Sequence, residues 1–242
     1  MTNNKSKTGK LFLIPTDLGS DNLDEVLPAY VKQKVEEIDY YIVENEKTAR
    51  RFIKKLTPQK VQADLKIYLL NKFTKDAEIP TFLEACQQGI NIGLLSEAGC
   101  PGIADPGAKV VEIAHQKNIK VTPLVGPSSI ILSMMASGMN GQNFTFHGYL
   151  PIDKNQRKNT IKKLERISLE QNQAQIFIET PYRNEKLLKD LLKFLHPLTR
   201  LCIAAEISLP TEFIKTKTIK DWKKEKVDLH KKPTIFILQR DF

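Results

Sequence analysis

Residues 96–107 (SEAGCPGIADPG) form the segment of this chain that most strongly suggests ligand chemistry. Three glycines and two prolines restrict its backbone path, and glycine lets a backbone approach a ligand closely. The carboxylates of Glu97 and Asp105 accept hydrogen bonds from a ribose or an amine. The segment lies between an apolar run and a helical pattern, where open α/β sheets bind ligands. A tight Asp-Pro-Gly turn before a helix is the structural alternative.

Residues 125–129 (VGPSS) form a second loop between an expected strand and an expected helix. The hydroxyl groups of Ser128 and Ser129 are placed to cap the helix that begins near Ser129. The free backbone amides at a helix start also bind polar or anionic groups. The loop therefore suits capping, ligand contact or both.

Several common catalytic motifs are absent from the sequence. It contains no G-x-G-x-x-G, G-x-x-x-x-G-K-[ST], H-E-x-x-H or G-x-S-x-G pattern. The four histidines, at positions 115, 147, 196 and 230, are too scattered to predict a metal cluster. Phosphate transfer and metal-dependent hydrolysis are therefore disfavoured, and no metal site is expected.

Strand and helix patterns alternate through the first part of the chain, which predicts an α/β domain with a mostly parallel sheet. Expected strands cover residues 11–15, 39–43, 66–70, 91–96 and 120–125. Expected helices cover residues 22–33 (bent at Pro28), 48–56, 80–88, 108–117 and 129–137.

A second domain is expected after the strand at residues 144–149, because composition changes near Leu150 and Pro151. We predict an N-terminal α/β domain over residues 1–148 and a C-terminal α+β domain over residues 149–242. In the second domain, expected helices cover residues 155–168 and 183–194, and expected strands cover residues 175–179, 201–207 and 234–240.

Composition predicts a folded cytoplasmic protein with anionic partners. The chain has 242 residues, is 41% hydrophobic and 27% charged, and carries a formal net charge of +9. It has no apolar run of the roughly 20 residues that a membrane helix needs, and no secretory leader pattern. Its three cysteines are far apart, which fits reduced thiols rather than a disulfide framework. The positive charge favours nucleic acid, although many basic proteins bind none.

Seven short motifs occur in a characteristic order along the chain. They are PTDLGS (15–20), VENEK (43–47), SEAGCPGIADPG (96–107), LVGPSS (124–129), ASGM (136–139), FTFHGYLP (144–151) and ETPYR (179–183). In this order the chain resembles the tetrapyrrole-methylase superfamily, and within it the branch that methylates the 2′-oxygen of a cytidine in small-subunit ribosomal RNA. The resemblance covers nearly the whole chain.

The resemblance implies a two-domain tetrapyrrole-methylase-like fold that binds S-adenosylmethionine in a cleft between its domains, and a homodimer that acts in rRNA processing. The implied cofactor contacts are Pro15, Ser96, Glu97, Ala98, Gly99, Ile103, Ala104, Asp105, Ser128, Ser129, Leu150, Ala205 and Pro233. The chain departs from that branch at residues 44–47 (ENEK for an acidic-Thr-Arg run) and at Glu97 (for aspartate). It also departs at residues 205–209, where only Glu206 is kept.

Methyl transfer from a sulfonium requires alignment of nucleophile and methyl group, and a general base helps when the nucleophile is a hydroxyl group. Glu44, Glu97 and Glu179 are the candidates by position, although each could instead be a structural hydrogen-bond acceptor.

A basic stripe on the helix at residues 155–168 is the candidate RNA-binding surface. Lys154, Lys158, Lys162 and Arg166 recur every four residues, which places them on one helix face. Arg157 widens the stripe, and Arg183 of the ETPYR motif joins the expected RNA contacts. Three functions remain open: an RNA methyltransferase, a small-molecule methyltransferase acting on a tetrapyrrole precursor, and a non-catalytic RNA- or ribosome-binding relative.

Overall fold

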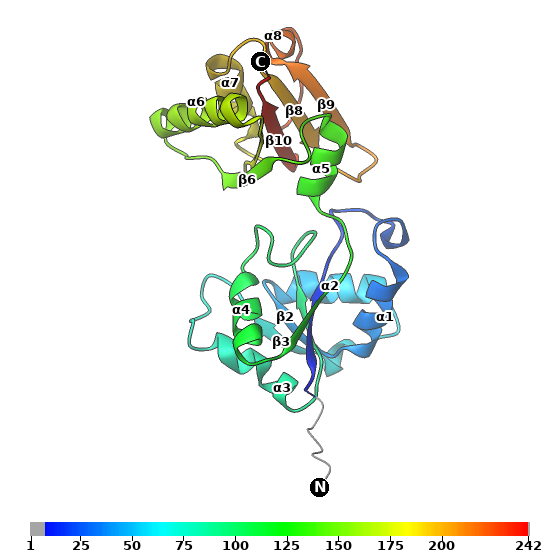
Figure 1. The fold of residues 1–242 in the computed structure, drawn as a ribbon. Coiled ribbons are helices and arrows are strands. Elements are labelled where there is room, and N and C mark those ends of the chain that lie inside the picture. Colours follow the sequence, from blue (N-terminus) through cyan, green and yellow to red (C-terminus); the bar gives the residue numbers. More distant parts are fainter. Residues whose placement is uncertain (1–7, 242) are drawn as a thin grey trace. The chain divides into compact units, whose positions relative to one another are not determined.

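The computed structural model describes residues 8–241 and divides the chain into two compact units, Met1–Ser128 and Ser129–Phe242 (Figure 1). Each unit has its own five-stranded sheet. None of the helices within residues 8–241 has both the length and the apolar character needed to cross a membrane.

The first unit is a parallel sheet in the order β3-β2-β4-β1-β5. Its strands are β1 (Lys10–Ile14), β2 (Tyr40–Val43), β3 (Lys66–Leu69), β4 (Ile92–Leu95) and β5 (Lys120–Pro123). Every residue of the central strand β4 is buried, as expected for a strand covered on both faces. The predicted parallel α/β domain is confirmed.

Helices cover both faces of this sheet. They are η1 (Leu23–Glu25), α1 (Ala29–Glu37), α2 (Glu46–Leu56), η2 (Gln62–Asp64), η3 (Ile79–Leu83), α3 (Glu84–Gln87) and α4 (Ala108–Gln116). The helices α1 and α2 contribute to one apolar cluster, and α3 and α4 contribute to another. The strands of this sheet are parallel, so the loops that follow β1, β2, β4 and β5 all lie at the same edge.

Pro28 separates η1 from α1, where the sequence pattern predicts one bent helix over residues 22–33. Its backbone angles, φ −58° and ψ 145°, leave the helical region, so the chain turns before α1 begins at Ala29. Proline also lacks the amide that a continuous helix would use. That single-helix prediction is wrong.

The second unit is a mixed sheet in the order β6-β7-β10-β8-β9, with only β6 and β7 parallel. Its strands are β6 (Phe144–Tyr149), β7 (Ala174–Ile178), β8 (Arg200–Ala205), β9 (Phe213–Thr218) and β10 (Thr234–Gln239). Its helices are α5 (Ser129–Ser137), α6 (Lys154–Gln171), α7 (Asn184–Phe194) and α8 (Ile219–Trp222). The predicted α+β class is confirmed, whereas β9 and α8 have no counterpart in the sequence prediction.

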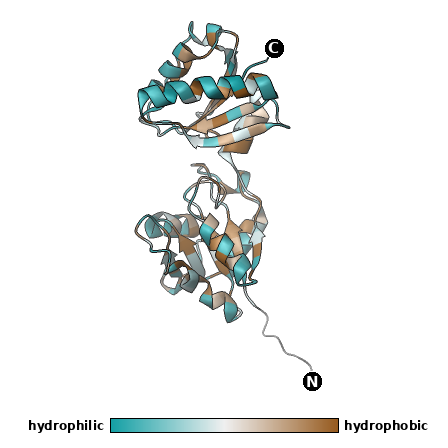
Figure 2. Cartoon of the chain, turned by 60° about the vertical axis from the view of Figure 1, so that its left-hand side comes forward, coloured by the Kyte–Doolittle hydropathy of each residue, from teal (hydrophilic) through white to brown (hydrophobic). Residues whose placement is uncertain are grey.

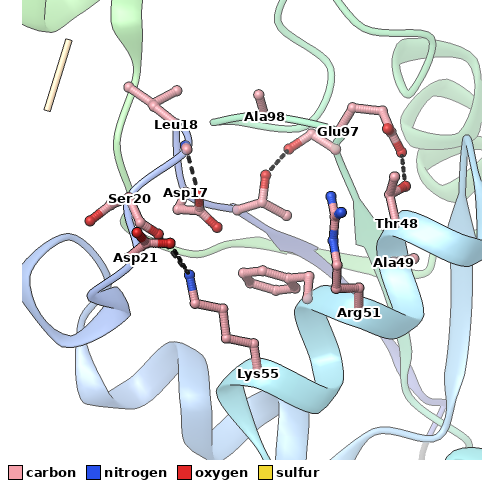
Figure 3. A pocket seen from close by; sticks show the side chains of 14 residues that line it. Asp17, Leu18, Ser20, Asp21, Thr48, Ala49, Arg51, Lys55, Glu97 and Ala98 are labelled. Atoms are coloured by element: carbon pink, nitrogen blue, oxygen red, sulfur yellow. Dashed lines mark hydrogen bonds and ion pairs between the residues drawn. The ribbon is translucent and has the colours of Figure 1, made fainter. Parts of the chain in front are cut away.

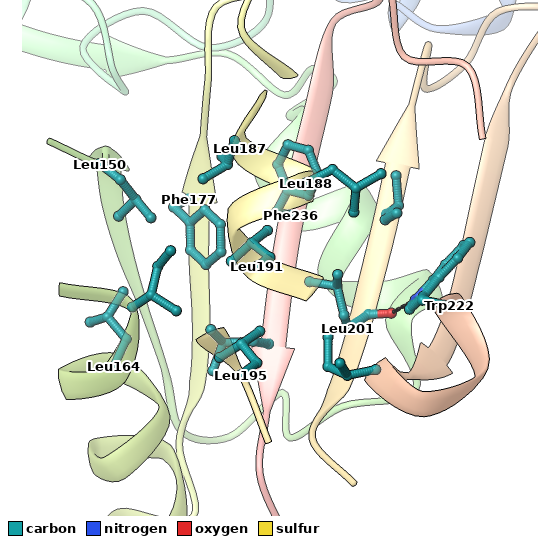
Figure 4. Packing of buried hydrophobic residues seen from close by; sticks show 14 of the residues in the cluster. Leu150, Leu164, Phe177, Leu187, Leu188, Leu191, Leu195, Leu201, Trp222 and Phe236 are labelled. Carbon is teal, nitrogen blue, oxygen red and sulfur yellow. Dashed lines mark hydrogen bonds between the residues drawn. The ribbon is translucent and has the colours of Figure 1, made fainter. Parts of the chain in front are cut away.

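The core of the second unit lies between the sheet and the helices α6, α7 and α8 (Figure 4). Phe177 and Phe236 stack within it, with ring centroids 6.0 Å apart. The indole of Trp222 donates a 2.7 Å hydrogen bond to the carbonyl of Leu201, which satisfies its one buried polar group.

The helix α5 belongs to the second unit, although the sequence places the domain boundary after residue 148. Ile130 and Met134 of α5 are buried, and the helix packs on β9 and β10. The Thr216 hydroxyl donates a 2.8 Å hydrogen bond to the carbonyl of Ser137 and ties the helix end to β9. The structural division therefore lies at Ser128, ahead of the predicted boundary.

Candidate active site

The loops after β1 and β4 are joined by hydrogen bonds at the carboxyl edge of the first sheet. The amide of Thr16 donates to the carbonyl of Gly99 at 3.0 Å, and the amide of Gly99 donates to the carbonyl of Asp17 at 3.4 Å. The buried Ser96 hydroxyl donates to the Gly99 carbonyl at 2.5 Å. Of the sequence-predicted residues, Ser96 and Gly99 therefore stabilise the conformation of the loop after β4 through hydrogen bonds.

The loop after β5 packs against both of these loops. A Cβ added at Gly126 would lie 2.3 Å from two side-chain carbons of Pro15, so only glycine fits there. The Cys100 thiol lies 3.3 Å from the carbonyl of Pro127. The loops that carry Pro15, Ser96 and Ser128 thus meet at one place within the first unit.

The backbone of the loop after β4 adopts left-handed conformations at Gly99 (φ 73°), Gly102 (φ 77°) and Ala104 (φ 59°). Ala104 has a Cβ, so this conformation is strained there, and strained backbone gathers at functional sites. The carboxylate of Asp105 accepts a 3.2 Å hydrogen bond from the amide of Gly107. The Asp-Pro-Gly turn exists, then, and the exposed Ile103 and Ala104 precede it on the surface.

Glu44, Glu97 and Asp105 form a cluster of carboxylates at this edge. The pKa of Glu44 is raised to about 7, first by burial. A hydrogen bond with Asp105 and the charges of Asp105 and Glu97 raise it further. Glu97 is exposed and accepts a 2.7 Å hydrogen bond from the Thr48 hydroxyl of α2. The sequence names these three carboxylates separately, and the fold of the first unit brings them together.

A pocket of about 580 Å³ opens beside this cluster, within the first unit (Figure 3). It lies between the loop after β1, the start of α2 and the beginning of the loop after β4. Its lining residues are Thr16, Asp17, Leu18, Gly19, Ser20, Asp21, Thr48, Ala49, Arg51, Phe52, Lys55, Ser96, Glu97 and Ala98. Sequence reasoning placed none of the α2 residues in the site, although α2 begins soon after β2 at the same edge.

In the second unit, Glu179 is paired rather than free. It is buried and accepts hydrogen bonds from the Thr180 amide at 2.7 Å and from the Arg183 guanidinium at 2.9 and 2.6 Å. The ETPYR motif therefore builds an ion pair at the end of β7. Arg183, expected to contact RNA, directs its guanidinium to this carboxylate.

Leu150, Ala205 and Pro233 also lie in the second unit. Leu150 and Ala205 are buried in its core, whereas Pro233 is exposed beside β10. The amide of Glu206, next to Ala205, donates a 2.9 Å hydrogen bond to the Pro233 carbonyl. Left-handed backbone occurs nearby at Glu206, Ser208 and Lys231, which marks this sheet end as a second strained region.

Four of the five residues predicted to form the basic stripe on α6 have exposed side chains. Lys154, Lys158, Lys162 and Arg166 are exposed on α6, whose outer side is mostly hydrophilic in Figure 2. Arg157 is only 3% exposed and forms an ion pair with Asp190 of α7.

The prediction of Arg157 as an RNA contact is wrong, because its guanidinium is used inside the unit. Besides Asp190, it donates to the carbonyls of Pro151 and Ile152 at 3.1 and 2.7 Å. Arg157 shares its helix face with Ile161, Leu164 and Ser168, which are also buried. It therefore fixes the start of α6 against α7.

No group of three or more His, Cys, Asp or Glu side chains suited to hold a metal ion occurs within residues 8–241. The chemistry available at the edge of the first sheet is that of carboxylates, hydroxyls, backbone groups and two cations, Arg51 and Lys55. It suits recognition of a polar organic ligand and proton transfer.

In a comparison with protein-family models, the family described as tetrapyrrole (corrin/porphyrin) methylases matches residues 19–223. Among sequence relatives, ribosomal RNA small subunit methyltransferase I of Buchnera aphidicola (subsp. Schizaphis graminum) is 29% identical over 239 residues. That alignment covers 98% of this chain and 80% of the relative. The protein of the same name from Thermotoga maritima is 30% identical, and the alignment covers 86% of this chain and 88% of that protein.

Among solved structures, the methyltransferase CobJ matches with a TM-score of 0.63 and 13% identity, covering 96% of this chain and 95% of that one. Uroporphyrin-III C-methyltransferase of Thermus thermophilus, solved with S-adenosylhomocysteine, matches with a TM-score of 0.53 and 14% identity. That match covers 96% of this chain and 98% of the enzyme. At these identities the two matches establish a shared fold.

Proposed function

The chain belongs to the tetrapyrrole (corrin/porphyrin) methylase family, and from that premise we propose that it is an S-adenosylmethionine-dependent methyltransferase whose acceptor is ribosomal RNA. The observation that carries the proposal is the similarity to ribosomal RNA small subunit methyltransferase I, which spans 98% of this chain in the Buchnera relative. That alignment includes the three loops of the first unit and the basic helix α6 of the second.

The loops of the first unit fit S-adenosylmethionine. Gly126 leaves no room for a side chain, since an added Cβ would lie 2.3 Å from Pro15. At Gly99, where φ is 73°, an added Cβ would lie 3.1 Å from the Pro127 carbonyl oxygen. Backbone groups are thus presented close to a ligand, and Glu97 and Asp105 accept hydrogen bonds from hydroxyl or ammonium groups. The proposed contacts of the first unit are Pro15, Ser96, Glu97, Ala98, Gly99, Ile103, Ala104, Asp105 and Ser128. From the second unit, the family resemblance adds Ser129, Leu150, Ala205 and Pro233.

S-adenosylmethionine, when bound, supplies a methyl group on a positively charged sulfur. The group would supply an electrophilic methyl carbon to a ribose hydroxyl of the acceptor, and the residues of this chain would hold the two in line. The hydroxyl proton must leave, and we assign its acceptance to Glu44. With a pKa of about 7, Glu44 is ionised often enough near neutral pH to take a proton and is still basic enough to hold it.

The other two glutamates suit different roles. Glu97 is exposed and hydrogen-bonded by Thr48, which favours contact with a ligand hydroxyl. Glu179 forms a buried ion pair with Arg183, which holds its carboxylate in place. In this proposal Glu44 is the base, Glu97 binds ligand and Glu179 is structural.

RNA as the acceptor is supported by the exposed cations of α6, namely Lys154, Lys158, Lys162 and Arg166. They lie on one helix side, and a phosphate backbone is attracted to such a row whatever its sequence. We further propose that the protein acts in rRNA processing as a cytoplasmic homodimer. Light scattering of the purified chain tests the dimer.

A transfer assay tests the function. Radiolabelled S-adenosylmethionine is incubated with the protein and small ribosomal subunits, total RNA or precorrin-type tetrapyrroles. Label in the RNA of small subunits, lost in Glu44→Gln, is the expected result. Label only in a tetrapyrrole would favour the small-molecule alternative, and cofactor binding without transfer to any acceptor would favour a non-catalytic relative.

A further inference from the structure

Arg51 of α2 is a cation that the first unit leaves without a partner. It lines the pocket and is exposed, and no hydrogen bond or ion pair joins it to any residue within 8–241. In Figure 3 its guanidinium rises from α2 toward the loop that carries Glu97, and no dashed line reaches it. An arginine side chain presents several donors in a fixed planar arrangement that matches a phosphate or carboxylate.

Other basic side chains of α2 have partners of their own. Arg50 pairs with Glu46 and donates to the carbonyl of Gln62. Lys54 donates to the Pro58 carbonyl at 2.9 Å, and Lys55 donates to the Ser20 carbonyl at 2.8 Å. Arg51 is the cation on the pocket wall whose donors remain available to a ligand.

The rest of the pocket wall suits a nucleoside rather than a free anion. Two cations, Arg51 and Lys55, face three carboxylates, Asp17, Asp21 and Glu97, so a free dianion would meet net negative charge. A nucleotide within an RNA strand carries one negative charge on its phosphodiester. Its hydroxyl and amino groups can donate hydrogen bonds to the carboxylates. The buried ring of Phe52 adds an apolar surface. At about 580 Å³, the pocket has the size of a small-molecule site.

We propose that this pocket binds one nucleotide of a single-stranded segment of the RNA acceptor, with Arg51 donating hydrogen bonds to its phosphodiester. The inference rests on the proposed function, because it takes RNA to be the acceptor. The pocket is lined by two loops and a helix, so it can admit a nucleotide that is turned out of a single RNA strand. An RNA duplex, by contrast, keeps its bases stacked inside. The nucleotide would then adjoin the cofactor at Ser96, Glu97 and Ala98, which line the pocket and are proposed cofactor contacts. Arg51 is a binding residue separate from the basic stripe of α6.

Fluorescence anisotropy with a labelled single-stranded RNA about 12 nucleotides long tests the proposal. The variant Arg51→Gln removes the charge from the pocket, and the matched control Lys54→Gln removes one from the same helix outside it. We expect Arg51→Gln to weaken RNA binding about tenfold and to reduce the slope of log affinity against log salt by about 0.7. Lys54→Gln should shift affinity less than about twofold.

RNAs with a single neutral methylphosphonate at successive positions sharpen the test. At one position the neutral linkage should weaken binding to the wild type about tenfold and leave binding to Arg51→Gln unchanged, because the same contact is already absent. Equal effects of Arg51→Gln and Lys54→Gln, or no binding of RNA by the wild type, would overturn the proposal. So would a loss of S-adenosylhomocysteine affinity in Arg51→Gln by calorimetry, because the pocket would then hold the cofactor.

The two hypotheses fail in different experiments. If the wild type transfers no methyl group to RNA, the proposed function fails, and the anisotropy series still decides whether Arg51 contacts a phosphodiester. If methyl transfer proceeds and Arg51→Gln binds RNA as Lys54→Gln does, only the pocket proposal fails.

Discussion

The two units of this protein surround their candidate functional carboxylates, Glu44 and Glu179, in different ways. In the second unit, Arg157 is paired with Asp190, and Glu179 is paired with Arg183. In the first unit, Glu44 lies against another carboxylate, Asp105, and the pKa of Glu44 is raised to about 7. Paired charges hold a structure in place, whereas a carboxylate without a cation partner is available to exchange a proton. We therefore propose that proton transfer takes place in the first unit, and that these two ion pairs stabilise the structure of the second.

The largest effect is expected from Arg157→Met, which tests whether pairing holds the second unit together. The variant leaves the carboxylate of Asp190 largely buried without its cation, and breaking a buried pair in this way costs about 3–5 kcal/mol. Urea unfolding, followed by tryptophan fluorescence, measures the loss through Trp222 of the same unit. The double variant Arg157→Met/Asp190→Leu should regain part of that stability. An unfolding free energy unchanged in Arg157→Met would show that this pair does not support the unit.

The next largest effect is expected from Glu44→Gln, which should lower methyl-transfer activity without unfolding the first unit. Glu44→Gln removes the proposed base, and a positioned base contributes about 100-fold or more to a rate. It also removes like-charge repulsion with Asp105 and Glu97, so unfolding in urea should occur at the same or a higher concentration. Single-turnover methyl transfer measures the rate.

Glu179→Gln serves as the contrasting variant. It leaves Arg183 without its counter-ion and should lower stability while affecting the chemical step less than Glu44→Gln. A larger loss of single-turnover rate in Glu179→Gln than in Glu44→Gln would reverse the assignment of the two units.

The pH dependence gives a smaller effect of defined sign. Because only the ionised form of Glu44 accepts a proton, the single-turnover rate should rise about tenfold per pH unit below pH 7 and level off above it. The folded pKa of Glu44 is raised above the usual value of 4.5 for a glutamate, so its ionisation is less favourable in the folded protein. Its contribution to stability is therefore present below pH 4.5 and is lost as pH rises through about 7.

Comparison of wild type with Glu44→Gln isolates this contribution. The difference in unfolding midpoint between the two proteins should grow in favour of Glu44→Gln as pH rises from 4.5 to 7. A difference that stays constant over this range would show that Glu44 is not the group that titrates.

Sequence periodicity predicted the bounds of helices and strands better than it predicted which elements pack against each other. The predicted bounds of α5 and β6 match the structure, because helix and strand periods are local properties. The unit to which α5 belongs depends on contacts with β9 and β10, and the lysines within β9 hide its strand pattern. Arg157 could have been placed correctly, since it is in helical register with Ile161 and Leu164. The pocket residues of α2 could not, because only the fold brings them beside Ser96 and Glu97.

The smallest predicted effect concerns the exposed cations of α6 in the second unit. Lys158 and Lys162 are exposed on α6, so each should contribute to RNA binding through long-range attraction rather than a fitted contact. Lys158→Gln should weaken binding of single-stranded RNA about threefold and reduce the salt slope by about 0.7. It should lower the free energy of unfolding by no more than about 1 kcal/mol, through loss of the contact between Lys158 and the Phe194 ring. The effect should be the same for every RNA sequence and should add to that of Arg51→Gln, because the two sites contact different phosphates. Anisotropy titrations over a range of salt concentrations measure both quantities. If Lys158→Gln left the salt slope unchanged, α6 would be a solvated helix face, and the RNA contacts would have to be sought in the first unit.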